Sequence, residues 1–191
     1  MFPRMTRERY LSDSELEAFM RAVRERRHVH QPRDHALFAL LANTGIRPSE
    51  ALALTRSDLH LGGKEPWMRV RRLKKKRLRP QFDDLVLTDE LAAAARAHLT
   101  CLDDRDDRVF GLGRRAAQRL FHYYARRAGI VRRCYLYMLR HTAATRIYRA
   151  TRDIAVVQAL LGHESPDTST IYAHVPRAML SELATTFPVV I

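Results

Sequence analysis

The residues of this chain that could do chemistry gather in its last third. They are Tyr137, Arg140 and His141, followed by His163 and Tyr172. A phenol becomes a nucleophile only when its proton is removed, because its reference pKa is about 10. A guanidinium group can hold an anion through two parallel hydrogen bonds. Core packing alone does not require such a set, so the elements that position it and supply its partners have to be found elsewhere in the chain.

Helical periodicity predicts how these side chains are placed. Apolar residues in the range 136–147 recur at steps of three and four, which predicts a helix. Tyr137 and Arg140 lie beside that apolar stripe, about one turn apart, so they can act together. A second helix should follow and end at Gly162, which leaves His163 on the turn just beyond it.

A second candidate arginine lies in the first half of the chain. Gly45 is typical of the left-handed residue that ends a helix. Pro48 and Glu50 suit the first turn of the next helix, so Arg47 should lie on the tight turn between the two. An isolated turn arginine is usually only solvent-exposed. Here the rigid turn fixes its direction, and Glu50 is close enough to hold its guanidinium group.

The only convincing strands lie between Trp67 and Leu87, and they predict a β-hairpin. Within Arg69–Arg79, eight of eleven residues are basic. A run of charges is usually a solvated face. On a hairpin, however, it forms a compact cationic finger that suits a groove or a row of phosphates.

The remaining elements are helical. A capping box formed by Ser12 and Glu15 predicts the start of the first helix. A later helix, beginning near Arg114, has an apolar back and a row of arginines on its other side. The chain is therefore expected to be an α+β, mainly helical domain with one small antiparallel sheet.

Composition points to a polyanionic partner. The 191 residues include 34 Lys and Arg against 21 Asp and Glu, a formal net charge of +13. The sequence has no apolar run near the roughly 18 residues that span a bilayer, and no signal peptide, so nucleic acid is favoured over a membrane. Cys101 and Cys134 do not form a C-x-x-C motif, which argues against a structural zinc site or a disulfide framework. A reducing, cytoplasmic compartment is expected.

Two ordered motifs resemble the phage integrase (tyrosine recombinase) family. The first is Thr44–Glu50; the second is Leu139–Thr142 with Leu161-Gly162-His163 and, nine residues after that histidine, Tyr172. The resemblance covers about residues 8–175. It implies the tyrosine recombinase catalytic-domain fold, as a single domain over 1–191 with a tail from 176 to 191 and no N-terminal core-binding domain.

The family resemblance also implies an activity and a set of roles. The chain should be a site-specific recombinase that cuts and rejoins DNA strands without metal, ATP or another cofactor. Tyr172 would be the nucleophile and form a 3′-phosphotyrosyl link. Arg47 and Arg140 would clamp the scissile phosphate, His163 would donate a hydrogen bond to it, and Glu50 would support Arg47.

The proton for the leaving 5′-hydroxyl usually comes from a hairpin lysine in this family. Arg72-Leu73-Lys74 resembles the sequence at this point in the short recombinases that invert fimbrial promoters. Lys74 is therefore the first candidate, and Lys75 and Lys76 remain alternatives.

One position departs from the family pattern. Three residues before Arg140 the family most often has a histidine, whereas this chain has Tyr137. Tyrosine can hydrogen-bond a phosphate oxygen but is a poor base near neutral pH. The departure keeps open a DNA-binding regulator of recombinase descent, and a type IB topoisomerase would use the same residue set.

The expected partners are double-stranded DNA, further copies of the chain (a dimer to a tetramer on DNA) and accessory DNA-bending proteins. The expected DNA contacts are basic residues of the hairpin and of the later helix, namely Arg69, Arg71, Arg72, Lys75, Lys76, Arg77, Arg79, Arg114, Arg115 and Arg119.

Overall fold

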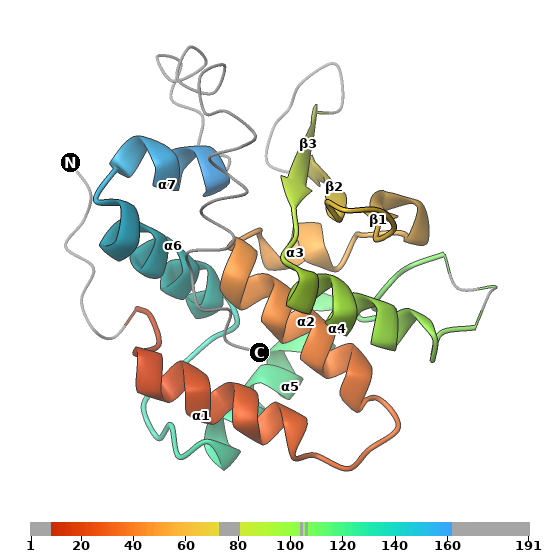
Figure 1. The fold of residues 1–191 in the computed structure, drawn as a ribbon. Coiled ribbons are helices and arrows are strands. Elements are labelled where there is room, and N and C mark those ends of the chain that lie inside the picture. The colour runs from red at the N-terminus through yellow and green to blue at the C-terminus, as the bar shows by residue number, and fades with distance from the viewer. Residues whose placement is uncertain (1–8, 73–80, 104, 106, 162–191) are drawn as a thin grey trace.

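The computed structural model describes residues 9–72, 81–103, 105 and 107–161 (Figure 1). Within these residues the fold is mainly helical with one small antiparallel sheet, as the sequence predicts. The helices are α1 (Asp13–Arg24), α2 (Gln31–Thr44), α3 (Pro48–Ala51), the 3-10 turn η1 (Arg56–Asp58), α4 (Asp89–Leu99), α5 (Arg114–Arg127), α6 (Met138–Thr151) and α7 (Ile154–Leu161). The strands are β1 (Leu59–His60), β2 (Trp67–Arg72) and β3 (Gln81–Val86).

The start of α1 has the predicted capping box. The Ser12 hydroxyl accepts a hydrogen bond from the Glu15 backbone N–H at 3.2 Å, and the Glu15 carboxylate accepts one from the Ser12 N–H at 2.7 Å. The two contacts satisfy N–H groups that have no partner inside the helix.

An aromatic cluster joins α1, α2 and α5. The ring of Phe19 lies 5.1 Å from those of both Phe38 and Phe121, measured between centroids. Tyr124 packs against the same rings and donates its hydroxyl hydrogen bond to the buried carboxylate of Asp34 at 2.7 Å. Burial of these large rings supplies much of the apolar area that stabilises the domain.

Helix α2 is the central helix. Residues 36–42 are all buried, so this helix is covered on every side rather than along one stripe. It packs against α1, α4 and α6, and α7 packs on α6 (Figure 1). The C-terminal end of α2 is thereby brought next to α6 and α7. No helix in the described part of the chain is long and apolar enough to cross a membrane.

The sheet has the order β1-β2-β3, with both pairs antiparallel. The short β1 adds a strand to the predicted hairpin. Along β2, Met68 and Val70 are buried while Arg69 and Arg71 are exposed, which is the period of two of a half-buried strand. Arg72 follows in the same alternation on the inner face. The tip of the hairpin, residues 73–80, lies outside the described residues, and with it Lys74, Lys75, Lys76, Arg77 and Arg79.

Candidate active site

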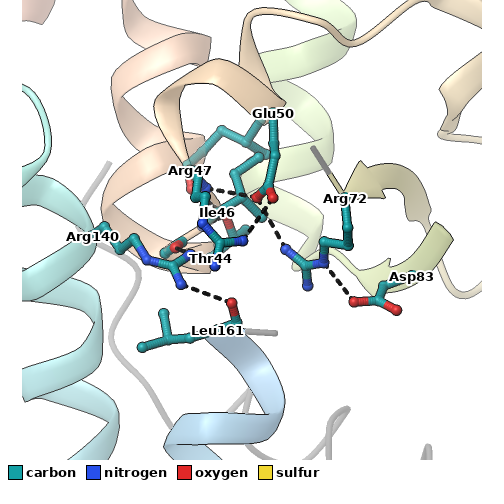
Figure 2. A network of polar contacts seen from close by, with 10 residues as sticks. Thr44, Ile46, Arg47, Glu50, Arg72, Asp83, Arg140 and Leu161 are labelled. Atoms are coloured by element: carbon teal, nitrogen blue, oxygen red, sulfur yellow. Dashed lines mark hydrogen bonds and ion pairs between the residues drawn. The ribbon is translucent and has the colours of Figure 1, made fainter. Parts of the chain in front are cut away.

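Arg47 lies on the turn between α2 and α3, as predicted. Helix α2 ends at Gly45, which has a left-handed φ of 64°. The backbone N–H of Arg47 donates to Glu50 Oε2 at 2.9 Å, and its Nη1 donates to Glu50 Oε1 at 2.8 Å (Figure 2). The Glu50 side chain is fully buried, so one carboxylate fixes both the backbone and the guanidinium group of Arg47.

Gly45 allows α6 and α7 to approach this turn closely. A Cβ atom at Gly45 would lie 2.7 Å from Leu161 Cδ2 and 3.1 Å from Ala143 Cβ. A side chain here would therefore be excluded both by the positive φ and by the two neighbouring helices. Glycine serves the site by letting α6 place Arg140 against the end of α2.

Arg140 joins the two halves of the chain. The whole residue is only 2% exposed to solvent. Nη1 donates to the Gly45 carbonyl oxygen at 2.7 Å. Nη2 donates to the Leu161 carbonyl oxygen at 2.8 Å (Figure 2). Both acceptors are neutral. Burial, helped by the like charges of Arg47 and Arg72, lowers the pKa of Arg140 to about 10.

Arg72 is brought into the same cluster. Its Nη1 donates to Glu50 Oε2 at 3.1 Å and its Nε donates to Asp83 Oδ2 at 2.5 Å (Figure 2). The sequence grouped Arg72 with the hairpin residues expected to contact DNA. In the structure its side chain is only 9% exposed and lies beside Glu50, unlike the exposed Arg69 and Arg71. The alternation with Met68 and Val70 was the signal that could have separated it from Arg69 and Arg71.

The other described members of the predicted DNA-contacting set lie at the surface. Arg69 pairs with Asp84 at 2.9 Å, and both side chains are more than 40% exposed. Together with the Arg72–Asp83 pair, this means that acidic residues of β3 neutralise part of the charge of β2. The remaining described members of the predicted DNA-contacting set are exposed: Arg71, Arg114, Arg115 and Arg119.

Tyr137 immediately precedes α6 and is 37% exposed. Its ring lies 5.1 Å from that of His141, in an edge-to-face arrangement. Burial and the nearby positive charge of Arg140 lower the pKa of His141, which favours its neutral imidazole. Tyr137 lies about one helical turn before Arg140, whose backbone N–H donates to the Tyr137 carbonyl oxygen at 3.1 Å, as the sequence predicts.

Lys74, His163 and Tyr172 lie outside the described residues. The described part of the site consists of Arg47, Arg72 and Arg140 with the carboxylates of Glu50 and Asp83. The cluster therefore contains three positively charged groups and two negatively charged ones. One of the two carboxylates, that of Asp83, is 34% exposed. A partly buried site with excess positive charge is suited to bind an anion such as a phosphodiester.

The buried carboxylate at the centre of this cluster gives a prediction about stability. Burial opposes ionisation of Glu50, but hydrogen bonds from Arg47 and the charges of Arg72 and Arg47 outweigh it, so the pKa of Glu50 is lowered. Glu50→Gln should reduce the free energy of unfolding by about 3 kcal/mol at pH 7, because two buried guanidinium groups lose their shared counter-charge.

The pH dependence of that difference follows from the lowered pKa. The stabilisation is complete above the ordinary glutamate pKa and is lost as the pH falls through the lowered value. Urea unfolding should show the two proteins converging between pH 7 and acidic pH. The exposed Glu17→Gln variant is the control, expected to change stability by less than about 0.5 kcal/mol. If the difference in the free energy of unfolding between the two proteins is the same at pH 7 and at acidic pH, the loss of stability comes from the changed hydrogen-bonding shape of the side chain and not from its lost charge.

Comparison with known proteins gives consistent matches over the described fold. The family model described as "Phage integrase family" matches residues 9–179. Tyrosine recombinase XerD of Shewanella oneidensis is 34% identical over 185 residues, which cover 92% of this chain and 61% of that protein. Tyrosine recombinase XerC of Chlamydia caviae is 33% identical over 153 residues, covering 75% of this chain and 47% of that protein. The chain thus spans about half to three-fifths of the length of these relatives.

Solved structures show the same fold. The XerH site-specific recombinase bound to its difH substrate, in a pre-cleavage complex, matches with a TM-score of 0.71 and 25% identity, over 94% of this chain and 53% of that one. The XerA recombinase matches with a TM-score of 0.68 and 28% identity, over 96% of this chain and 65% of that one. Because the family model matches residues 9–179 and solved recombinases have the same fold, the chain belongs to the phage integrase family.

Proposed function

We propose that this chain is the catalytic part of a site-specific DNA recombinase that cuts and rejoins strands through a phosphotyrosyl link to Tyr172. The observation that carries the proposal is the meeting of Arg47 and Arg140 around the end of α2, from positions 93 residues apart in the sequence. Each has a fixed orientation, Arg47 through Glu50 and Arg140 through two carbonyl oxygens. Oriented cations of this kind stabilise the charge that develops on a phosphate under attack.

The proposed reaction needs no external energy source. The Tyr172 oxygen attacks phosphorus while its proton passes to water, and the bond from phosphorus to the 5′-oxygen breaks. The leaving oxygen takes a proton, which we assign to Lys74, with Lys75 and Lys76 as alternatives. His163 donates a hydrogen bond to the phosphate. The phosphotyrosyl bond keeps the energy of the broken phosphodiester, so attack by a second 5′-hydroxyl can reseal a strand.

The proposed partners are double-stranded DNA and other copies of the chain. Exposed Arg71, Arg114, Arg115 and Arg119 would contact phosphates outside the site, with the basic residues of the hairpin. Among the relatives, XerH is described as bound to its DNA substrate before cleavage. An assembly of two to four protomers on DNA, with accessory DNA-bending proteins, remains part of the proposal. A kinship with the short fimbrial-switch recombinases rests only on Arg72-Leu73-Lys74.

The test is to trap a covalent complex. The purified chain is incubated with fragmented DNA of its own genome, in EDTA and without ATP, and the DNA ends attached to protein are sequenced. Recovery of a recurrent sequence, linked through its 3′ end, supports a site-specific recombinase. A chain that relaxes supercoiled plasmids lacking that sequence would act as a topoisomerase. A chain that binds DNA and forms no adduct would be a regulator.

Tyr137 is the residue at which this chain differs from the usual family pattern. Tyr137→His should keep the rate of adduct formation or raise it, by up to roughly 10²-fold, because an imidazole is a better base near neutral pH than a phenol. The exposure of Tyr137 lets the replacement fit without disturbing the core. The rate is measured in a single turnover on a nicked duplex of the trapped sequence.

Tyr135→His is the matched control for this replacement, since Tyr135 has the same 37% exposure two residues earlier. Its rate should stay within about twofold of the wild type. Complete loss of cleavage in Tyr137→His alone would show that the Tyr137 phenol has a role that histidine cannot fill.

A further inference from the structure

Arg72 is held in the site by two carboxylates from different elements. As the last residue of β2 it lies on the inner face of the sheet, in line with buried Met68 and Val70. Asp83 of β3 and Glu50 of α3 each accept one of its hydrogen bonds. The side chain is only 9% exposed, whereas that of Arg69, three residues earlier on the outer face, is 46% exposed. Arg72 is therefore built into the site and does not belong to the outer charged face.

One nitrogen of this buried guanidinium group is bound by neither of the two carboxylates. Nε and Nη1 of Arg72 are used by Asp83 and Glu50, but Nη2 is buried and has no hydrogen-bond partner among the residues that the structure describes. A buried donor on a charged group is costly to leave unpaired, so native proteins rarely keep one without a reason. A ligand that accepts the hydrogen bond is such a reason.

The surroundings of this nitrogen favour a negatively charged ligand. Arg72 and Arg47 bind the same Glu50 carboxylate, which keeps their guanidinium groups adjacent (Figure 2). Arg140 lies close enough for the charges of Arg47 and Arg72 to contribute to the lowering of its pKa. An anion bound among the three would relieve this repulsion and accept the hydrogen bond from Nη2.

We propose that Arg72 is a third phosphate-binding arginine of this site, whose Nη2 donates a hydrogen bond to a non-bridging oxygen of the phosphate that Arg47 and Arg140 clamp. The role in cleavage rests on the function proposed above. An arginine does not give up its proton in a protein, so Arg72 acts by charge and orientation and does not replace the lysine as proton donor. The site thus contains one more fixed cation than the two arginines found from the sequence motifs.

The first experiment tests charge at the reacting phosphate. Arg72→Met, Arg72→Lys and the control Arg149→Met, which removes an exposed arginine of α6 that pairs with Asp13, are compared on a nicked duplex of the trapped sequence. The scissile position carries either a normal phosphate or a methylphosphonate, which lacks one charged oxygen. On the phosphate, Arg72→Met should slow adduct formation about 10²-fold, and Arg72→Lys, which keeps the charge but loses the fork, about tenfold. On the methylphosphonate, the loss in Arg72→Met should shrink to a few-fold. Arg149→Met should stay within about twofold on both.

An equal loss in Arg72→Met on the two substrates would overturn the proposal in favour of a structural role, and no loss on either would also overturn it. Arg72→Lys keeps the test valid should the methionine variant fail to fold.

The second experiment does not depend on cleavage. The Tm of each variant is measured in inorganic phosphate and in chloride at equal ionic strength, because a ligand that binds the folded state raises the Tm. The wild type and Arg149→Met should gain stability from phosphate, and Arg72→Met should lose at least half of that gain. A wild type that forms no adduct but shows this Arg72-dependent gain would refute the proposed recombinase and leave the anion site standing. An equal gain in all variants would refute the anion site.

Discussion

Replacing Tyr172 by phenylalanine should abolish the covalent link between this protein and DNA. The change removes a single oxygen, and without it no other step of the proposed reaction can form a bond to phosphorus. Adduct formation should fall by at least about 10³-fold, to the background of the assay. DNA affinity should stay within about twofold, because the arginines that we propose to bind phosphate are untouched. Denaturing gels of the nicked duplex after a single turnover measure the first quantity, and gel-shift titrations at fixed salt measure the second.

A second tyrosine provides the control for that experiment. Tyr148 lies on α6 with 43% exposure, and the proposed chemistry makes no use of it. Tyr148→Phe should therefore form adduct at the wild-type rate. If Tyr172→Phe still forms a covalent complex, the nucleophile is another residue, and peptide mapping of the linked fragment would identify it.

Much of the fold follows from signals that are local in the sequence. The capping box at Ser12 and Glu15, the glycine at the end of α2 and the alternation along β2 each depend on a few neighbouring residues, and each is present in the structure. The contact between Arg47 and Glu50 is of the same kind, since both residues belong to one tight turn. Short-range signals of this sort can be read without knowing how the elements pack.

The parts that sequence reasoning missed depend on packing between distant elements. Nothing near Arg72 in the sequence indicates that Glu50, 22 residues away, shares its carboxylate with it. The helix-ending role of Gly45 could be predicted, but its close contact with Leu161 and Ala143 could not. The pairing of Asp83 and Asp84 with β2 also needed the strand register, which places Arg69 opposite Asp84. Counting only the basic residues of the hairpin therefore overestimates its unpaired positive charge, because in the described strands Asp84 pairs with Arg69 and Asp83 with Arg72.

Arg140 gives the second large effect, because its side chain joins two elements of the fold and, in the proposed reaction, also stabilises the phosphate. Arg140→Ala should slow adduct formation by about 10²–10³-fold at saturating DNA, through loss of charge stabilisation at the phosphate. The replacement also leaves the carbonyl oxygens of Gly45 and Leu161 without their donor. An unpaired buried acceptor costs about 1–3 kcal/mol, so the free energy of unfolding should fall measurably in the same variant.

Arg140→Lys separates these two roles, because a lysine keeps the charge but cannot donate to both carbonyl oxygens and the phosphate in one plane. Its cleavage rate should lie between those of the wild type and Arg140→Ala. Single-turnover rates at saturating DNA, combined with urea unfolding of each variant, measure the two effects independently. Arg149→Ala on the same helix is the control, since its exposed pair with Asp13 should contribute less than about 1 kcal/mol. If Arg140→Lys is folded and cleaves as fast as the wild type, the geometry of the guanidinium group serves only to join α2 to α7, and phosphate binding at this position requires no more than a positive charge.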